Sequence, residues 1–272
     1  MEDMILTVNH LCKSYPQFSL SDVSFSLPKG AIMGLIGENG AGKSTTMKLI
    51  LGMTSPDSGS ISVFGHTGCS AKDREDIGVV FDELPFAQTL FVSHLGRIMK
   101  GIYQNWDQKQ YEEYLQKFAL PDKKELKDFS RGMKMKLSLA VALSHNAKLL
   151  ILDEPTAGLD PAGRDEILEL LARMRRDLGI TIILVSHSME DVAKYVDRLF
   201  VMNDGELMLE GAPKEVFRHY KELEAVGLAA PQVTYIMHEL KEKGLDVDLD
   251  ATTIDEAKQT ILDALRHRPT AN

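Results

Sequence analysis

The stretch GENGAGKST at residues 37–45 decides the fold of this chain. It fits the phosphate-binding loop pattern G-x-x-x-x-G-K-[ST], with Lys43 and Ser44 at the defining positions. The apolar run Ala31–Ile36 precedes it, and apolar side chains at helical spacing follow it over residues 47–53. A strand before the loop and a helix after it argue against a glycine-rich turn with a chance lysine.

The composition of this loop suits phosphate chemistry. Glycines let the backbone curl so that consecutive N–H groups point at the phosphates, and the following helix directs its N-terminal dipole at the same charge. Lys43 would reach the β- and γ-phosphates, and the Ser44 hydroxyl would ligate Mg²⁺. The residues expected to bind the nucleotide here are Gly37, Asn39, Gly40, Ala41, Gly42, Lys43, Ser44 and Thr45.

A second segment with catalytic potential is the apolar run Leu149–Leu152, which ends in Asp153 and Glu154. In P-loop ATPases the corresponding strand lies beside the phosphate loop, so Asp153 could hold the Mg²⁺ shell. Glu154 would then act as the general base that polarises the attacking water. Without the phosphate loop, the same pattern would be interpreted as a surface turn.

Two further segments carry polar groups at the ends of predicted elements. Ser130, in FSRGM at residues 129–133, precedes a helix expected over Lys134–Leu143. Its hydroxyl and the helix N-terminus could bind an anion, although a serine in this place is usually only a helix cap. His187 follows the predicted strand Thr181–Val185, where its side chain could contact a γ-phosphate. A lone histidine at such a position is more often structural.

Taken in order, these segments resemble the ATPase domain of ABC transporters over about residues 4–215. Gly37–Thr45 is similar to the Walker A segment, Leu149–Glu154 to Walker B, Ser130–Met133 to the signature, Ala157–Asp160 to the D-loop and His187 to the switch histidine.

The resemblance implies a mechanism. Two such domains pair head to tail, and each ATP–Mg²⁺ lies between the Walker A segment of one domain and the signature of the other. Lys43, Glu154 and His187 would be the catalytic residues. Further nucleotide contacts are expected from the adenine-stacking Tyr15 and from Ser130, Gly132, Met133 and Asp160. The signature residues would serve the nucleotide of the partner domain.

The chain departs from the family pattern in two places. Asp82 stands where the family has the Q-loop glutamine that ligates Mg²⁺. Its acceptor oxygen still permits ligation, so Asp82 joins Ser44 and Asp153 as an expected metal ligand. The signature has Arg131 and Met133 in place of a glycine and a glutamine, while its serine and second glycine remain.

The two halves of the chain resemble different branches of the family. Residues up to about Asp160, including Trp106-Asp107, resemble ATPases of ABC-2-type exporters. From about Asp165 onward the sequence resembles ATPases of energy-coupling-factor importers, most clearly over Val185–Ala193 and Glu210–Phe217. We therefore hypothesise a mosaic, natural or engineered, joined near residues 155–180.

The expected fold class is α/β. The alternation of strands and helices predicts a mainly parallel sheet with helices on both faces, and the resemblance adds an antiparallel β subdomain. Residues 1–218 would form the ATPase domain, with a helical insertion over about residues 86–146. Residues 219–272 would form a small α-helical C-terminal extension that could contribute to dimerisation.

Composition limits the function classes. A net charge of −9 over 272 residues argues against a nucleic-acid partner. No apolar run approaches the roughly 20 residues that span a bilayer, and the first residues lack the pattern of a secretory signal. Cys12 and Cys69 suggest neither a disulfide framework nor a metal cluster. We expect a cytoplasmic protein, peripheral on the cytoplasmic face of the membrane through a membrane partner.

The leading hypothesis is an ATP-hydrolysing transport subunit with ATP and Mg²⁺ as ligands. Its expected partners are a second ATPase domain, identical or different, and an integral membrane permease. The main alternative is a soluble ABC ATPase acting on ribosomes or DNA, which the single Walker A segment and the absence of sustained heptads disfavour. A degenerate binding module is disfavoured because Lys43, Asp153, Glu154 and His187 are all present.

Overall fold

Two sheets form the centre of the molecule, and the computed structural model describes residues 3–81 and 84–266. The larger sheet has the strand order β10-β9-β3-β8-β7-β6, and all its neighbouring strands are parallel except β10 and β9. Its strands are β3 (Ile32–Ile36), β6 (Ile77–Val80), β7 (Leu149–Asp153), β8 (Thr181–Val185), β9 (Arg198–Asn203) and β10 (Glu206–Gly211).

Both faces of this sheet are buried, as the continuous apolar runs of its strands require. Side chains alternate between two hydrophobic cores. In β7, Leu150 and Leu152 belong to one core, and Leu149 and Ile151 belong to the other. The expected α/β fold with a mainly parallel sheet is confirmed.

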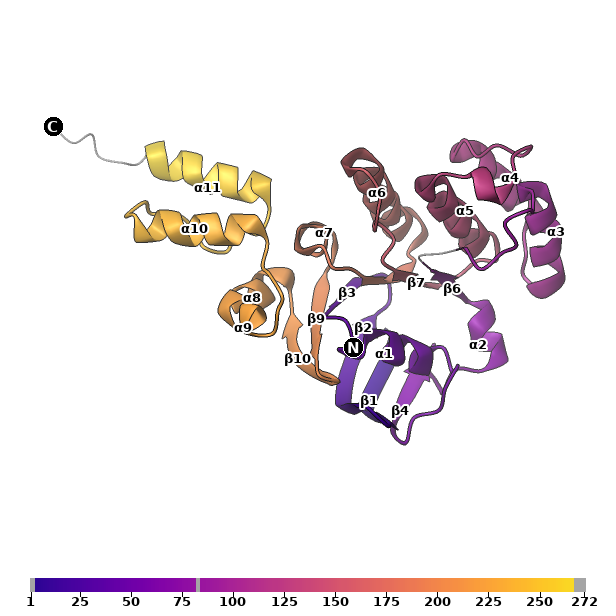
Figure 1. Ribbon diagram of the computed structural model, residues 1–272, viewed down its shortest axis with the longest axis horizontal. Helices are drawn as coiled ribbons and strands as arrows, with labels where there is room; N and C mark the ends of the chain where they lie inside the picture. The colour runs from indigo at the N-terminus through magenta and orange to yellow at the C-terminus, as the bar shows by residue number, and fades with distance from the viewer. Residues whose placement is uncertain (1–2, 82–83, 267–272) are drawn as a thin grey trace.

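A smaller antiparallel sheet covers one face of the larger one. Its strand order is β2-β1-β4-β5, and helix α1 lies between the two sheets (Figure 1). Leu6 and Leu27 of this sheet share a core with Met47 of α1 and Phe200 of β9. The elements are α1 (Lys43–Ile50), β1 (Met4–Tyr15), β2 (Phe18–Pro28), β4 (Ser58–Val63) and β5 (His66–Thr67).

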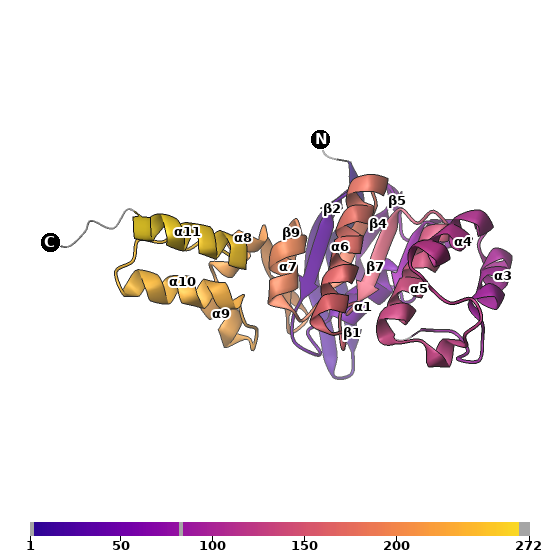
Figure 2. The same cartoon turned by 90° about the horizontal axis from the view of Figure 1, so that it is seen from above.

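A group of helices gathers at the β6 end of the large sheet, which confirms the expected helical insertion (Figures 1 and 2). Tyr111 is fully buried there, and its hydroxyl donates to the Val92 carbonyl at 3.0 Å. The elements of the insertion are α3 (Val92–Ile102), α4 (Gln108–Lys117), the short 3₁₀ helix η1 (Leu126–Asp128) and α5 (Arg131–Ser144). Helix α2 (Ala71–Glu75) precedes β6 and lies outside the insertion.

Helices α6 (Pro161–Leu178) and α7 (Met189–Tyr195) cover the same face of the large sheet as α5 (Figure 1). The sequence sets both ends of α6. The Asp160 carboxylate caps its N-terminus by accepting from Gly163 N at 2.9 Å, with proline next in the chain. Gly179, in the left-handed conformation at φ 66°, ends it.

The chain after β10 forms two layers of helices. Helices α8 (Pro213–Phe217) and α9 (Tyr220–Ala225) pack into the main core through Phe217 and Leu223. Helices α10 (Gln232–Glu242) and α11 (Ile254–Arg266) lie side by side at the end of the molecule opposite the helical insertion (Figures 1 and 2). Residues 232–266, the C-terminal hairpin, have a small core of their own around Met237 and Val247. The expected division after residue 218 stays a prediction.

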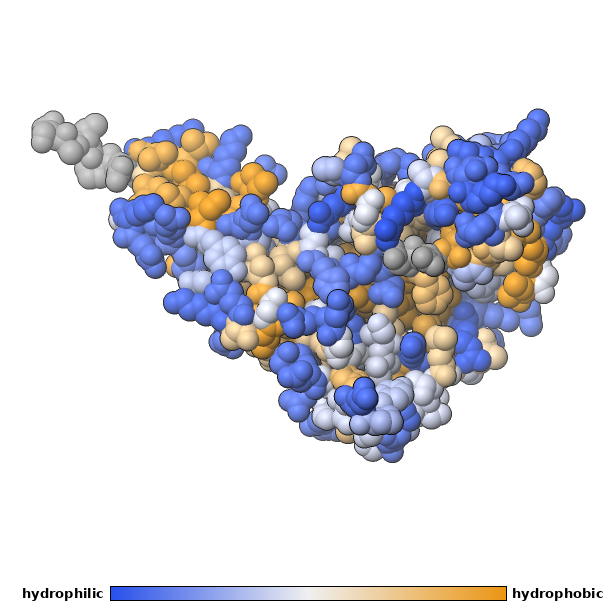
Figure 3. Space-filling model, viewed as in Figure 1, coloured by the Kyte–Doolittle hydropathy of each residue, from blue (hydrophilic) through white to orange (hydrophobic). Residues whose placement is uncertain are grey.

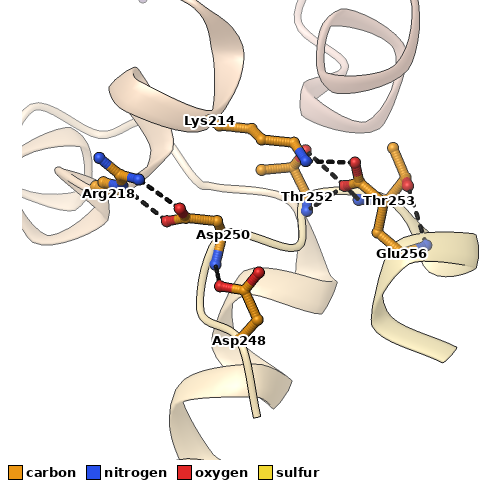
Figure 4. Close-up of polar contacts among 7 residues, drawn as sticks. All are labelled: Lys214, Arg218, Asp248, Asp250, Thr252, Thr253 and Glu256. Atoms are coloured by element: carbon orange, nitrogen blue, oxygen red, sulfur yellow. Dashed lines mark hydrogen bonds and ion pairs between the residues drawn. The ribbon is translucent and has the colours of Figure 1, made fainter. Parts of the chain in front are cut away.

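Two ion pairs tie the C-terminal hairpin to α8 and the residue after it (Figure 4). Arg218 Nε donates to Asp250 Oδ1 at 2.7 Å, and its Nη2 donates to Oδ2 of the same carboxylate. Lys214 Nζ lies 2.5 Å from Glu256 Oε1. The hydrogen bond from Arg218 holds the pKa of Asp250 below its ordinary value.

Across residues 3–81 and 84–266, no helix is both long and apolar enough to span a lipid bilayer.

Replacing Asp250 with asparagine should loosen the C-terminal hairpin. A carboxylate whose pKa falls on folding stabilises the structure above its unfolded pKa, and this contribution is lost as the pH falls through the folded value. At pH 7 we expect amide hydrogen exchange in α10 and α11 to accelerate several-fold. Asp246→Asn is the matched control, since Asp246 is 96% exposed and pairs only with Lys241 of the same hairpin. Equal exchange in the two variants would contradict the prediction.

Candidate active site

The loop between β3 and α1 depends on glycine at two positions where the backbone comes close to other groups. A Cβ on Gly37 would lie 2.4 Å from the Met202 carbonyl oxygen of β9. Gly42 caps α1 at φ 106°, and a Cβ there would lie 3.0 Å from both the Phe18 ring and Leu20. Another residue at either position would push the loop away from the sheet.

Lys43, the first residue of α1, is buried at the centre of this loop. Its Nζ donates to the Gly37 carbonyl at 2.6 Å and to the Glu38 carbonyl at 3.0 Å. Burial lowers the pKa of Lys43, while the nearby carboxylates of Glu154 and Asp153 act in the opposite direction. The ammonium is held by neutral carbonyls, which a more strongly charged acceptor such as phosphate can replace.

Asp153 and Glu154 stand at the end of β7, which lies next to β8 in the sheet. Burial raises the pKa of both carboxyl groups, against the lowering effect of Lys43 and His187. Glu154 has φ 49°, a conformation uncommon for a residue with a side chain, and its N–H donates to the Val185 carbonyl at 3.1 Å. Such local strain is concentrated at functional sites.

Glu154 and His187 face each other. His187 Nε2 lies 3.2 Å from Glu154 Oε1. That oxygen is buried and makes no well-aligned hydrogen bond with any residue in the described part of the chain. A carboxylate oxygen has room for more than one donor, so this atom can accept from a water or another ligand bound in the site beside His187.

The structure brings most of the predicted site residues together. They line one cavity of about 280 Å³ at the carboxyl ends of the parallel strands, the edge where α/β sheets bind ligands. Gly37 and Ala41 support the loop from behind, and the Ala41 carbonyl accepts from Gly205 N at 3.1 Å. The lining residues are Phe18, Asn39, Gly40, Gly42, Lys43, Ser44, Thr45, Asp153, Glu154 and His187.

The aromatic residue in the cavity wall is one that sequence reasoning missed. Phe18 begins β2 and pairs with Tyr15 at the end of β1. Tyr15 itself is 41% exposed, with Lys13 Nζ 5.9 Å from the centre of its ring. The adenine contact of Tyr15 stays a prediction. Phe18 could have been found from the sequence because it lies three residues after Tyr15, across the turn between two predicted strands.

A buried polar network, also absent from the sequence reasoning, holds the two catalytic loops. Asp191 on α7 accepts from Thr156 Oγ1 at 3.2 Å and from Arg164 Nε at 2.8 Å. Thr156 lies two residues after Glu154, and Asp191 lies four residues after His187. The network therefore links the loop after β7 to the loop after β8, and so fixes the spacing of Glu154 and His187.

The signature residues form a second group. The Ser130 hydroxyl caps α5 by accepting from Met133 N at 3.2 Å, and Met133 packs on the main core. Gly132 faces Leu159 of the D-loop, since a Cβ on it would lie 3.8 Å from that side chain. Of the cavity-lining residues in the described ranges, none belongs to this group, and Asp160 is engaged as the cap of α6.

Mg²⁺ fits the oxygen donors of the cavity. Ser44 and Asp153 both line it, and residues 3–81 and 84–266 contain no cluster of three or more metal-ligating His, Cys, Asp or Glu side chains. Mg²⁺ usually takes one or two protein oxygens and completes its shell with phosphates and water. Asp82, the third expected ligand, lies outside the described residues.

Comparisons with known proteins agree with this geometry. The sequence profile described as "ABC transporter" matches residues 20–157. The energy-coupling factor transporter ATP-binding protein EcfA2 of Clostridium perfringens is 37% identical, with 98% of this chain and 99% of that protein aligned. The EcfA2 of Clostridium acetobutylicum is 39% identical, with 91% of each chain aligned.

Solved structures give the same result. CbiO1 from Clostridium perfringens, described as part of the ABC transporter complex cbiONQ, matches with a TM-score of 0.71. It is 32% identical, and the match covers 88% of this chain and 100% of that one.

The alignments with EcfA2 extend across the join suggested near residues 155–180. The likeness to energy-coupling factor proteins is thus not confined to the C-terminal part of the chain. Whole-chain alignments do not compare the halves separately, so the mosaic origin stays a hypothesis.

The phosphate loop, the paired carboxylates and the facing histidine thus occur in one cavity, in the order along the chain that the family resemblance requires. The profile match and the relatives cover this same region. The chain belongs to the ABC transporter family, as an ATP-binding subunit.

Proposed function

We propose that this chain hydrolyses ATP to drive a membrane permease, in a complex where two ATPase domains pair head to tail. One observation carries the proposal. Lys43 at the start of α1, Asp153 and Glu154 at the end of β7, and His187 after β8 line a single cavity with the phosphate loop. A cation, a pair of carboxylates and backbone donors in one place suit the transfer of a phosphoryl group to water.

Each residue has a proposed role. Lys43 and the loop N–H groups would bind the β- and γ-phosphates, and Ser44 and Asp153 would hold Mg²⁺. When bound, Mg²⁺ neutralises part of the phosphate charge. Glu154 would accept a proton from the attacking water through its partly buried carboxylate. His187, 3.2 Å away, would hold that carboxylate and the water in position.

The second ATPase domain is needed to complete the site. Ser130 begins a 14-residue helix whose N-terminus can bind an anion, yet it lies outside the wall of the phosphate cavity described above. Ser130 and Gly132 would therefore contact the nucleotide of the partner domain. The relatives are named as ATP-binding parts of transporters, which favours a membrane partner over action on ribosomes or DNA.

The membrane partner would bind an apolar groove between the sheet and the helical insertion. This groove has a volume of about 350 Å³, and we name it the apolar groove. Met53 and Ile102 in its wall are 65% and 60% exposed, which is unusual for large apolar residues in a cluster. A cytoplasmic helix of the permease fits such a groove, and binding there would hold the chain on the cytoplasmic face of the membrane.

The C-terminal hairpin is proposed to contact the second ATPase domain. It extends from the ATPase domain, and apolar side chains gather on its exposed face (Figure 3). The exposed large apolar residues of the hairpin include Ile254, Leu265 and Ile236, which are 76%, 50% and 49% exposed. Burial of this face against a second domain would remove apolar surface from water.

Glu154→Gln should abolish turnover and spare binding. The amide keeps the shape of the side chain and cannot accept a proton, so kcat should fall at least about 100-fold. The affinity for ATP, measured by titration calorimetry with Mg²⁺, should change little. Glu206→Gln, on an exposed part of β10, is the matched control and should behave as the parent. Full turnover by Glu154→Gln would remove this residue from its proposed role.

Ile102→Asp should weaken attachment to the permease. A charge in the apolar groove must be desolvated when the permease docks. The fraction of the protein that sediments with membranes prepared from the cells that produce it should therefore fall about tenfold. ATP turnover by the purified variant should stay at the parent level. Ile98→Asp is the control, since Ile98 lies on the same helix, is 42% exposed and does not line the groove. Equal release of both variants would exclude the groove as the docking site.

A further inference from the structure

Two aromatic rings stack at the inner end of the helical insertion. The rings of Tyr103 and His145 are parallel within 2°, with their centres 4.0 Å apart. Tyr103 directly follows α3, and His145 directly follows α5. Tyr103 is half-buried and His145 is only 1% exposed. Because both residues end helices of the insertion, the stack fixes the end of α3 against the end of α5.

His145 also fastens α5 to the end of α2, just before the chain enters the large sheet. Its Nδ1 lies 2.9 Å from the carbonyl oxygen of Glu75, two residues before β6 begins. A carbonyl can only accept, so Nδ1 carries the hydrogen of this bond. Burial lowers the pKa of His145, so the imidazole is neutral at physiological pH. A neutral ring can stack flat on Tyr103 without the cost of burying a charge.

The same end of α5 packs closely against the sheet on one side. A Cβ on Gly78 of β6 would lie 2.7 Å from Ala142 Cβ and 2.6 Å from Leu150 Cδ2. The carbonyl of Ser144 accepts from Asp107 N at 2.7 Å, which ties it to the start of α4. This end of α5 is therefore held by the sheet, by α4 and by the Tyr103–His145 stack.

The other end of α5 carries Ser130. A 14-residue helix is about 21 Å long, so a tilt of about 5° at the His145 end would displace Ser130 by about 2 Å. A displacement of that size is enough to make or break a hydrogen bond. The placement of Ser130 thus depends on the angle at which α5 leaves the sheet.

We propose that the stacked pair Tyr103–His145 is the joint that sets the angle of α5, and that both are positioning residues for the signature serine. The importance of that angle for turnover rests on the proposed function, in which Ser130 contacts the nucleotide of a second domain. Both rings also line the apolar groove. A permease helix bound there touches the joint directly, and its contact reaches the signature through α5.

A distance measurement on the isolated chain tests whether the Tyr103–His145 pair sets the angle of α5. The two native cysteines are first removed by Cys12→Ser and Cys69→Ser. Spin labels are then attached at Asp128→Cys, just before the signature, and at Lys48→Cys on α1. The distance between the two labels measures the position of the signature relative to the phosphate loop. We expect Tyr103→Leu and His145→Gln to broaden the distance distribution by about 2 Å or more. Tyr103→Phe keeps the ring and should match the parent. Tyr114→Leu removes a stacked ring elsewhere in the insertion, where Tyr114 packs on Phe118 at 5.6 Å, and should also match the parent.

A kinetic measurement on the assembled transporter accompanies the distance. Tyr103→Leu should lower kcat several-fold and leave the ATP KM unchanged, because the phosphate cavity is untouched. An unchanged distance distribution in Tyr103→Leu and His145→Gln would contradict the proposed role of the Tyr103–His145 pair. Equal broadening in Tyr114→Leu would contradict it as well. If Tyr103→Leu does not fold, the distance distributions of His145→Gln and Tyr103→Phe are compared instead. Equal distributions in these two variants would overturn the proposal. The distance does not depend on a second domain, so failure of the proposed function would appear separately, as full turnover by Glu154→Gln.

Discussion

The order of three parallel strands, β3-β8-β7, is the constraint on which the rest of the structure depends. Parallel strands place their carboxyl ends along one edge, so the phosphate loop after β3 meets His187 after β8 and Asp153 and Glu154 after β7. The phosphate loop is separated from the other groups by more than a hundred residues in the chain. Both faces of the sheet are buried in apolar cores, which keep the strand ends in register.

The site is electrostatically costly without its ligands. Lys43 is withdrawn from water among backbone carbonyls, and Asp153 and Glu154 are partly buried beside it. Taking one group away from such a cluster would leave an uncompensated charge. Glu154 additionally holds a left-handed backbone conformation. A cluster of this kind contributes little to stability, and its value lies in the charge that a triphosphate and Mg²⁺ bring to the cavity.

Sequence reasoning identified the groups that local patterns determine. The phosphate loop, the apolar strands and the Ser130 cap depend on neighbours a few residues away, and the structure contains all three. The helix after Ser130 begins at Arg131, three residues before the expected start at Lys134, because the serine caps it directly. Phe18 and the Asp191 network escaped it because their meaning depends on contacts between distant segments. Thr156 and Asp191 are 35 residues apart, and nothing in either neighbourhood points to the other. The stack of Tyr103 on His145 escaped for the same reason.

The helical insertion and the C-terminal hairpin lie at opposite ends of the molecule, on either side of the sheets (Figure 2). The insertion shares the main hydrophobic core with the sheet, and His145 bonds to Glu75 at the end of α2. At the other end, Arg218 after α8 pairs with Asp250 of the hairpin. The most direct test of the nucleotide site is a crystal structure of Glu154→Gln with ATP and Mg²⁺. The γ-phosphate should contact Lys43, Mg²⁺ should lie between Ser44 and Asp153, and the signature of a second domain should cover the phosphates. A nucleotide bound away from this cavity, or phosphates covered by no second domain, would contradict that arrangement.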